Sequence, residues 1–374
     1  MQFAASRHAD ADAGSSRFGE SRFGPARGGA WLEEGQADGS GRTSGLYRAP
    51  DADGGVAQLT VLRPTSPGAQ PALVAMPSVS RPKGPKALSL PGGRRGVLLF
   101  HGLSSSPLEL QYLARGLHRA GFSVRIPVIQ GYSHGLPAPT PAGHQEWAAA
   151  ALAEFDRMRE QCDSLAVGGL CIGALLSLHV AAERPDRVSH LLSLSTTLRY
   201  DGWAVPRTRL LLPLARVLPW AGRIAVKERE PFGLKDARLR AWIAAQMKES
   251  GGSDAGAAAF RVRDLLQAQD LMQLVRRGLK RICAPTLLIH AREDEAASPK
   301  SAYEVASGVS SSRVHCVFLN DCYHMISIDK EKARVLSEMK DFLQDPPSPD
   351  ASSGAASQIV TTPATARSQT HVRA

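Results

Sequence analysis

The sequence predicts an α/β fold: a mostly parallel sheet with helices on both faces and an inserted helical cap. Short apolar runs rich in β-branched residues alternate with amphipathic segments of helical length, which is the pattern of βαβ units around a parallel sheet. One long interval past the middle of the chain lacks this alternation. Both ends have compositions that cannot bury enough apolar surface to fold.

The two ends are predicted to lie outside the folded domain. Residues 1–94 are rich in Gly, Ala, Ser, Pro and Arg with little periodicity, so we expect a mostly disordered extension in which only Val56 to Leu62 has weak strand character. In residues 346–374 the apolar surface is too small to offset the entropy of ordering, which predicts a disordered tail. The folded domain is therefore expected over residues 95–345.

Within this domain, apolar runs predict strands and the amphipathic segments between them predict helices. The expected strands are 96–100, 122–127, 164–168, 188–193, 285–291 and 313–319. The expected helices lie near 107–120, 145–160, 172–183, 299–308 and 330–342. Pro185 follows the third of these helices, where proline ends a helix because it cannot continue one.

The interval from about 196 to 282 contains helical pieces, prolines and no convincing strand, which predicts a cap inserted into the domain. Residues 199–281 carry 17 Lys and Arg against 8 Asp and Glu, so nearly all of the chain's net charge of +10 lies there. Three interpretations of this charge stay open: steering of anionic substrates such as CoA esters, weak association with anionic membrane surfaces, and ordinary solvated helix faces.

Several classes of function are not supported by the composition. No basic run interleaved with aromatic residues accompanies the positive charge, so we expect no nucleic-acid partner. No apolar stretch reaches the roughly 18 residues of a transmembrane segment, and the N-terminus lacks the apolar segment of a signal peptide. Five cysteines without a secretory signal predict reduced thiols in a cytoplasmic protein. We expect no metal and no cofactor, and the oligomeric state stays unknown.

The strongest chemical signal is the segment Gly169-Leu170-Cys171-Ile172-Gly173 between an apolar strand and an apolar helix. It is the nucleophile-elbow pattern G-x-S-x-G with cysteine at the serine position. The glycines are needed because the strand turns sharply into the helix beside a strained nucleophile. A helix N-terminus also favours a thiolate. Taken alone, the segment fits a buried structural cysteine equally well.

The residues after the last two predicted strands favour a catalytic interpretation. Asp294 follows the strand 285–291 and His324 follows the strand 313–319, which gives the chain order nucleophile, acid, base. Asp201 and Glu293 are the alternative acids. The catalytic prediction is a triad of Cys171, His324 and Asp294.

The loop after the strand 96–100 is predicted to complete an oxyanion hole. It is placed to offer the backbone N–H of Leu103, and the residue after the nucleophile, Ile172, offers the second N–H. His101, at the end of the same strand, is expected to be structural.

Four sequence blocks resemble the bacterial carboxylesterase and monoacylglycerol-lipase branch of the α/β-hydrolases, also described as serine aminopeptidase S33-like: GVLLFHG, GLCIGA, HAREDEAASPKSA and DCYHMISIDKEKARV. Gly131 to Trp147 is similar to that branch's Gly/His loop and the following helix. The resemblance covers about 95–345 apart from the cap. It implies the α/β-hydrolase fold, with Asp294 at the family's acid and His324 at its base. Cys171 departs from the branch's serine and is similar to the elbow of dienelactone hydrolases and polyhydroxyalkanoate synthases, which form thiol acyl-enzymes.

Three functions stay open at this point. The leading one is an acyl hydrolase of the carboxylesterase, lipase or thioesterase type, in which Cys171 attacks a small-molecule ester or thioester. His324 would take and return the proton, and Asp294 would orient the imidazole. An acyltransferase similar to polyhydroxyalkanoate synthase would use the same residues. A non-catalytic binding protein on this scaffold is disfavoured, because a site without catalysis has no need of all these groups.

Overall fold

The computed structural model describes residues 85–136, 142–218, 220–250, 252–253, 256–257 and 259–344, and three separate strands at 30–32, 46–48 and 358–362. The chain divides into two compact units, residues 1–79 and 80–374. In the first unit, β1 (Ala30–Leu32) pairs antiparallel with β2 (Leu46–Arg48). The strand suggested at Val56 to Leu62 lies outside the described residues.

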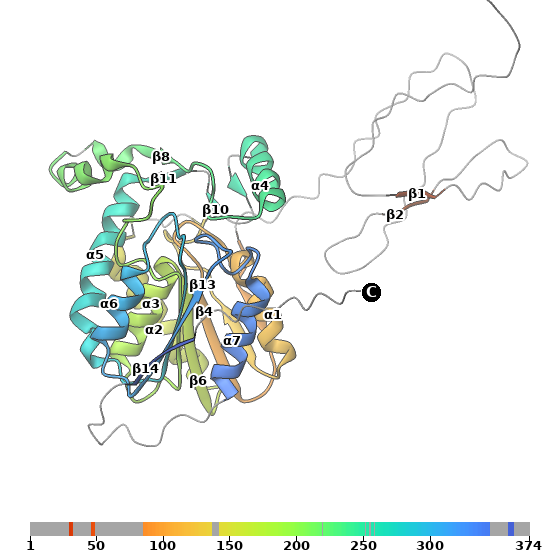
Figure 1. Cartoon of the computed structure of the whole chain (residues 1–374), viewed down its shortest axis with the longest axis vertical. Helices are drawn as coiled ribbons and strands as arrows, with labels where there is room; N and C mark the ends of the chain where they lie inside the picture. Colours follow the sequence, from red (N-terminus) through yellow and green to blue (C-terminus); the bar gives the residue numbers. More distant parts are fainter. Residues whose placement is uncertain are drawn as a thin grey trace, which may run out of the picture. The chain divides into compact units, whose positions relative to one another are not determined.

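The second unit is built on an eight-stranded sheet of order β14-β13-β12-β7-β6-β4-β5-β3 (Figure 1). All neighbouring strands are parallel except β3 and β5. The central strands are almost entirely buried, which explains why they read as continuous apolar runs. The strands are β3 (Leu88–Leu90), β4 (Arg95–Phe100), β5 (Ser123–Ile126), β6 (Ser164–Leu170), β7 (Leu191–Leu194), β12 (Thr286–Ala291), β13 (Arg313–Leu319) and β14 (Gln358–Thr362).

Helices cover both faces of this sheet, as the sequence predicts (Figure 1). One face carries η1 (Pro107–Leu110), α1 (Gln111–Arg119) and α7 (Lys332–Gln344), and the other carries α2 (His144–Arg159), α3 (Ile172–Glu183), α5 (Val262–Gly278) and α6 (Lys300–Gly308). Because α3 packs between the sheet and the helices α2 and α5, it is apolar around its whole circumference.

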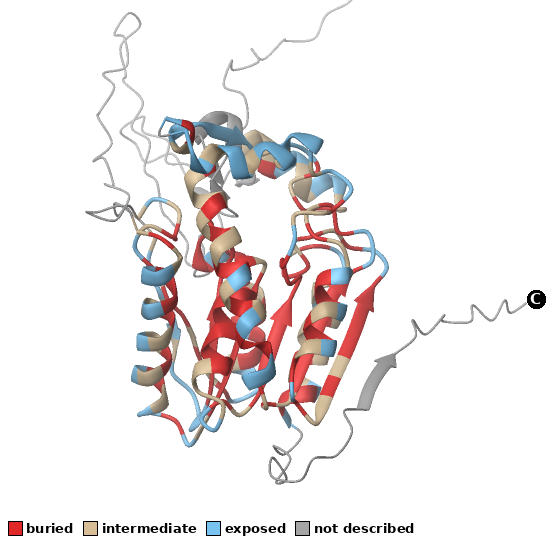
Figure 2. Cartoon of the chain, turned by 90° about the vertical axis from the view of Figure 1, so that its left-hand side faces the viewer, coloured by how far each residue is buried: buried red, intermediate tan, exposed pale blue. Residues whose placement is uncertain are grey.

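The segment between β7 and β12 forms a cap over one end of the sheet, and its outer surface is largely exposed (Figure 2). It contains η2 (Arg207–Arg216), η3 (Ala221–Arg223), β8 (Ala225–Lys227), α4 (Ala237–Ser250), β9 (Gly252–Ser253), β10 (Gly256–Ala257), β11 (Ala259–Arg261) and η4 (Leu279–Arg281). The expectation of a cap without strands is wrong, since β8 pairs antiparallel with β11 and β9 with β10. Strands of two or three residues are too short to produce a visible alternation in the sequence.

The helix α5 belongs to the helical layer beside the sheet as well as to the cap. Leu271, Met272 and Val275 are buried in the core cluster that this helix shares with α2 and α3. The predicted cap, about 196–282, therefore ends in a helix that packs on the main domain.

Two edge strands lie in stretches for which the sequence predicted disorder. β3 lies within residues 1–94 and pairs with β5, and β14 lies within residues 346–374 and pairs with β13. The prediction is wrong at these residues because a strand can join a sheet edge through backbone hydrogen bonds, which composition does not encode. Most of the remaining residues of both stretches lie outside the described part of the chain. No helix among the described residues has the length and apolar content needed to cross a membrane.

Candidate active site

Cys171 lies at the turn from β6 into α3, in a strained backbone conformation with φ 59° and ψ −119°. The end of β4 packs directly against this turn. A Cβ atom on Gly173 would collide with the backbone carbonyl oxygens of Phe100 and His101, and one on Gly169 would collide with the backbone of Gly173. The two glycines are needed because main chain approaches them closely on both sides.

His324 and Asp294 form a buried pair at the ends of the neighbouring strands β13 and β12. The Nδ1 atom of His324 lies 2.8 Å from Oδ2 and 3.0 Å from Oδ1 of Asp294, so it donates to the carboxylate. Asp294 Oδ1 also accepts the backbone N–H groups of Ala296 and Ala297, at 2.9 and 2.8 Å. The carboxylate is thus fixed in position, and it fixes the imidazole ring in turn.

The charges of this pair favour the protonated imidazole. Burial alone would lower the pKa of His324, but the Asp294 carboxylate and then Cys171 raise it well above its usual value. Burial acts to raise the pKa of Asp294, yet His324 and the hydrogen bonds hold that pKa below its usual value. The ring's Nε2 atom has no hydrogen bond of normal length among the described residues. Cys171 is thus one of the groups that favour the protonated ring.

Backbone contacts hold the loop that carries His324 in place. The Glu295 carboxylate accepts the backbone N–H of His324 at 3.0 Å, and the Ser195 hydroxyl donates to its carbonyl oxygen at 2.7 Å. The Thr197 hydroxyl lies 3.5 Å from the Cys171 sulfur and 3.2 Å from the Ser195 carbonyl oxygen. Loops after three neighbouring strands, β7, β12 and β13, therefore meet beside Cys171.

Two backbone amides beside this group are free. Neither Leu103 N–H nor Ile172 N–H donates to any other residue that the structure describes. Their neighbours are paired: Gly102 N–H donates to Glu109 at 2.7 Å and Ser104 N–H to the Tyr132 carbonyl at 3.0 Å. Free amides beside the end of β4 and at the start of α3 suit an anionic oxygen formed at a reacting carbonyl.

Comparison with known proteins agrees with this geometry: residues 93–331 match the family model for serine aminopeptidase, S33. The chain belongs to the serine aminopeptidase S33 family. It is 22% identical over 250 residues to the thermostable monoacylglycerol lipase of Bacillus sp. (strain H-257), covering 67% of this chain and 90% of the relative. It is 23% identical over 274 residues to a carboxylesterase of Bacillus subtilis (strain 168), covering 70% and 96%.

A crystal structure of monoacylglycerol lipase from Paleococcus ferrophilus shares the fold with this S33-family chain. Its TM-score is 0.57 at 18% identity, over 69% of this chain and 97% of that one. The predicted fold, the family resemblance and the class of enzyme, an α/β-hydrolase, are confirmed. Members of the family usually have serine at the elbow, where this chain has Cys171.

The alternative acids of the S33-family chain do not reach the imidazole. Asp201 accepts the backbone N–H and the hydroxyl of Ser298, at 2.9 and 2.8 Å. Glu293 forms an ion pair with Lys235 at 2.9 Å. Among the predicted acids, only Asp294 contacts His324 in the described part of the chain.

His101 has the surroundings of a structural residue. It is buried, and burial lowers its pKa to about 4, which leaves the ring neutral. Its Nδ1 atom donates to the Gly102 carbonyl and its Nε2 atom accepts the Ser133 hydroxyl, both at 2.8 Å. The ring supports the loop that contains Leu103.

Two carboxyl groups with raised pKa values, the buried Glu109 and the half-buried Glu228, are the residues that sequence reasoning missed. Burial raises the pKa of Glu109 to about 7, although its hydrogen bond from Gly102 opposes the shift. Glu228, just after β8, has a pKa raised to about 7 by burial and by Glu295. Glu109 is the only charged residue in the stretch 102–113, which is the one signal that could have marked it. Nothing in the cap sequence marks Glu228.

Proposed function

We propose that this S33-family enzyme cleaves acyl esters or thioesters of small molecules through a covalent thioester on Cys171. The observation that carries the proposal is a strained cysteine beside a buried His324–Asp294 pair. The free amides of Leu103 and Ile172 support it, since acyl transfer needs donors for an oxyanion. The relatives named lipase and carboxylesterase support an ester as the substrate.

In the first half-reaction, the Cys171 thiolate attacks the carbonyl carbon and the carbonyl electrons move to oxygen. The amides of Leu103 and Ile172 hydrogen-bond this oxyanion, and one such donor typically lowers the barrier by about 3 kcal/mol. As the intermediate collapses, the bond to the leaving group breaks and the Nε2–H of His324 protonates it. The acyl group is then a thioester on Cys171.

In the second half-reaction, a water molecule attacks the thioester carbonyl while His324 Nε2 accepts its proton. The carbon–sulfur bond breaks, the carboxylic acid leaves, and the thiolate and imidazolium are restored. Asp294 keeps Nδ1 protonated and Nε2 directed to the reaction throughout. An alcohol in place of water would give acyl transfer with the same groups.

The test is to incubate wild-type protein, C171A and H324A with 4-nitrophenyl butyrate and to follow nitrophenol release and intact mass. Wild type should release nitrophenol and gain a butyryl group that alkylation of Cys171 prevents. Both variants should lose acyl-enzyme formation and keep a melting temperature within a few degrees of wild type. Near wild-type turnover by C171A would refute the mechanism.

Added butanol separates the two catalytic functions. Butyric acid as the product identifies a hydrolase, and butyl butyrate identifies an acyltransferase. A folded wild-type protein that is neither acylated nor active on esters and thioesters of several chain lengths would point to the binding-protein alternative.

A further inference from the structure

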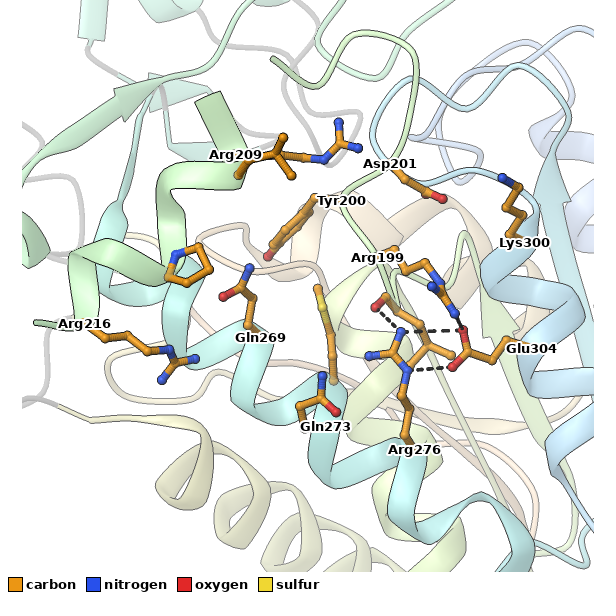
Figure 3. Close-up of a pocket in the computed structure, with 14 residues that line it drawn as sticks. Arg199, Tyr200, Asp201, Arg209, Arg216, Gln269, Gln273, Arg276, Lys300 and Glu304 are labelled. Carbon is orange, nitrogen blue, oxygen red and sulfur yellow. Dashed lines mark hydrogen bonds and ion pairs between the residues drawn. The ribbon is translucent and has the colours of Figure 1, made fainter. Parts of the chain in front are cut away.

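A pocket of about 1060 Å³ lies between the cap and the helical layer (Figure 3). Its walls come from residues 198–201 after β7, from η2, from α5 and from the start of α6. Residues from 198–216, from α5 and from α6 therefore border one space, which is large enough for a small-molecule ligand.

The lining of this pocket is strongly cationic. Five of its residues are basic and two are acidic; the basic ones are Arg199, Arg209, Arg216, Arg276 and Lys300, and the acidic ones are Asp201 and Glu304. Beside this basic excess, the lining contains the apolar residues Leu198, Leu210, Pro213 and Met272. The basic excess suits a ligand with anionic oxygens.

Most of these charges already have partners. Glu304 accepts from both Arg199 and Arg276, at 2.6 Å each (Figure 3), and Arg216 pairs with Asp270 at 2.7 Å. Asp201 is held by Ser298, as described above. Arg209 and Lys300 form no ion pair with any residue that the structure describes. They are the two cations still available to a ligand.

Neutral hydrogen-bond donors also line the pocket. Gln269 and Gln273 are one turn apart on α5, and Figure 3 shows both beside the pocket. Their amide groups have no hydrogen-bond partner within the described residues. The hydroxyl of Tyr200 is buried and likewise lacks a described partner. A buried polar group without a partner is costly, so this hydroxyl is a natural contact for a ligand.

The pocket adjoins the nucleophile through one short segment. The Thr197 hydroxyl lies 3.5 Å from the Cys171 sulfur, and the next four residues line the pocket. Tyr200, three residues after Thr197, is one of these lining residues, and its hydroxyl is buried. A substrate bound at Cys171 can therefore extend into the pocket.

We propose that this pocket binds an anionic group, a carboxylate or a phosphate, of the substrate whose acyl group is transferred to Cys171. Arg209 and Lys300 supply the charged contacts, and Gln269 and Gln273 supply hydrogen bonds. The inference rests on the proposed function and narrows its substrate class to acyl compounds with an anionic oxygen group.

The experiment uses two matched pairs of substrates. The carboxylate pair is mono-4-nitrophenyl glutarate and 4-nitrophenyl butyrate, and the phosphate pair is S-butyryl-4′-phosphopantetheine and S-butyryl-pantetheine. For each pair, the ratio of kcat/KM for the anionic to the neutral member is measured in wild type, R209Q, K300Q and R207Q. Arg207 is the matched control, an exposed arginine of η2 that does not line the pocket.

We expect R209Q and K300Q each to lower this ratio about tenfold in at least one pair of substrates. The reason is that a charge-assisted hydrogen bond typically strengthens binding by about tenfold or more. R207Q should leave it within about twofold, because Arg207 does not line the pocket. The pair that responds identifies the anionic group as carboxylate or phosphate.

An unchanged ratio in both pairs and both variants would refute the inference while the proposed function stands, because the neutral substrates are still cleaved. Two variants are used so that a folding defect in one leaves a second measurement. If wild type cleaves none of the four compounds, the proposed function itself fails, and the inference fails with it.

Discussion

Replacing Glu109 with glutamine should reduce the fall in the free energy of unfolding between about pH 4.5 and pH 8 by about 3 kcal/mol. Burial raises the pKa of this carboxyl from 4.5 to about 7, and each unit corresponds to about 1.4 kcal/mol. Folded protein therefore binds this proton more tightly than unfolded protein. The resulting stabilisation is complete below about pH 4.5 and is lost as the pH rises through about 7. Glutamine stays neutral, so E109Q has no such loss.

The assay is urea unfolding of wild type and E109Q at about pH 4.5 and pH 8. The free energy of unfolding should fall between these pH values by about 3 kcal/mol less in E109Q than in wild type. Glu228 and Glu295, whose pKa values are also raised, contribute to both profiles and largely cancel in the difference, since Glu109 is the smallest of the named causes for Glu228. Glutamine can still accept the Gly102 N–H that Glu109 accepts.

E160Q is the matched control, because it removes one carboxyl from the exposed end of α2. Its profile should follow wild type within about 0.5 kcal/mol. Parallel profiles for wild type and E109Q would contradict the reasoning, since they would mean that Glu109 does not bind its proton more tightly in the folded enzyme.

Two further predictions concern the site. Limiting iodoacetamide near neutral pH should modify Cys171 first, with activity lost in proportion, because burial raises the pKa of Cys322 to about 12 and keeps that thiol unreactive. Peptide mapping identifies the modified cysteine. Loss of activity with Cys322 modified and Cys171 intact would show that Cys171 is not the nucleophile. D294N should lower kcat by about 10⁴-fold or less, since the acid orients His324 and does not react. E293Q is the control, and a larger loss of kcat in E293Q than in D294N would identify Glu293 as the acid.

The triad candidates could be predicted because each follows a strand. Parallel strands end at the same edge of a sheet, so the order of Cys171, Asp294 and His324 along the chain predicts that they lie close together. The bounds of most strands of the sheet could be predicted too, because buried parallel strands read as apolar runs. β7 is an exception, beginning at Leu191 rather than at 188.

The surroundings of the triad candidates could not be predicted, because they depend on contacts between segments without periodicity. η2 is an irregular 3₁₀ segment interrupted by Pro213, so no pattern shows that Arg209 lines a pocket together with residues of α5. Glu109 is exposed or buried according to how η1 meets the loop after β4, which a single sequence does not reveal. The edge strands β3 and β14 depend on pairing alone.

Because β4 approaches the elbow closely, the shape of the turn does not depend on which side chain residue 171 carries. The collisions that a Cβ would cause at Gly169 and Gly173 involve main-chain atoms only, so nothing in them depends on whether residue 171 carries sulfur or oxygen. Serine and cysteine differ by that one atom. Within the S33 family, the choice between oxygen and sulfur chemistry can therefore change by a single codon substitution while the backbone stays as it is.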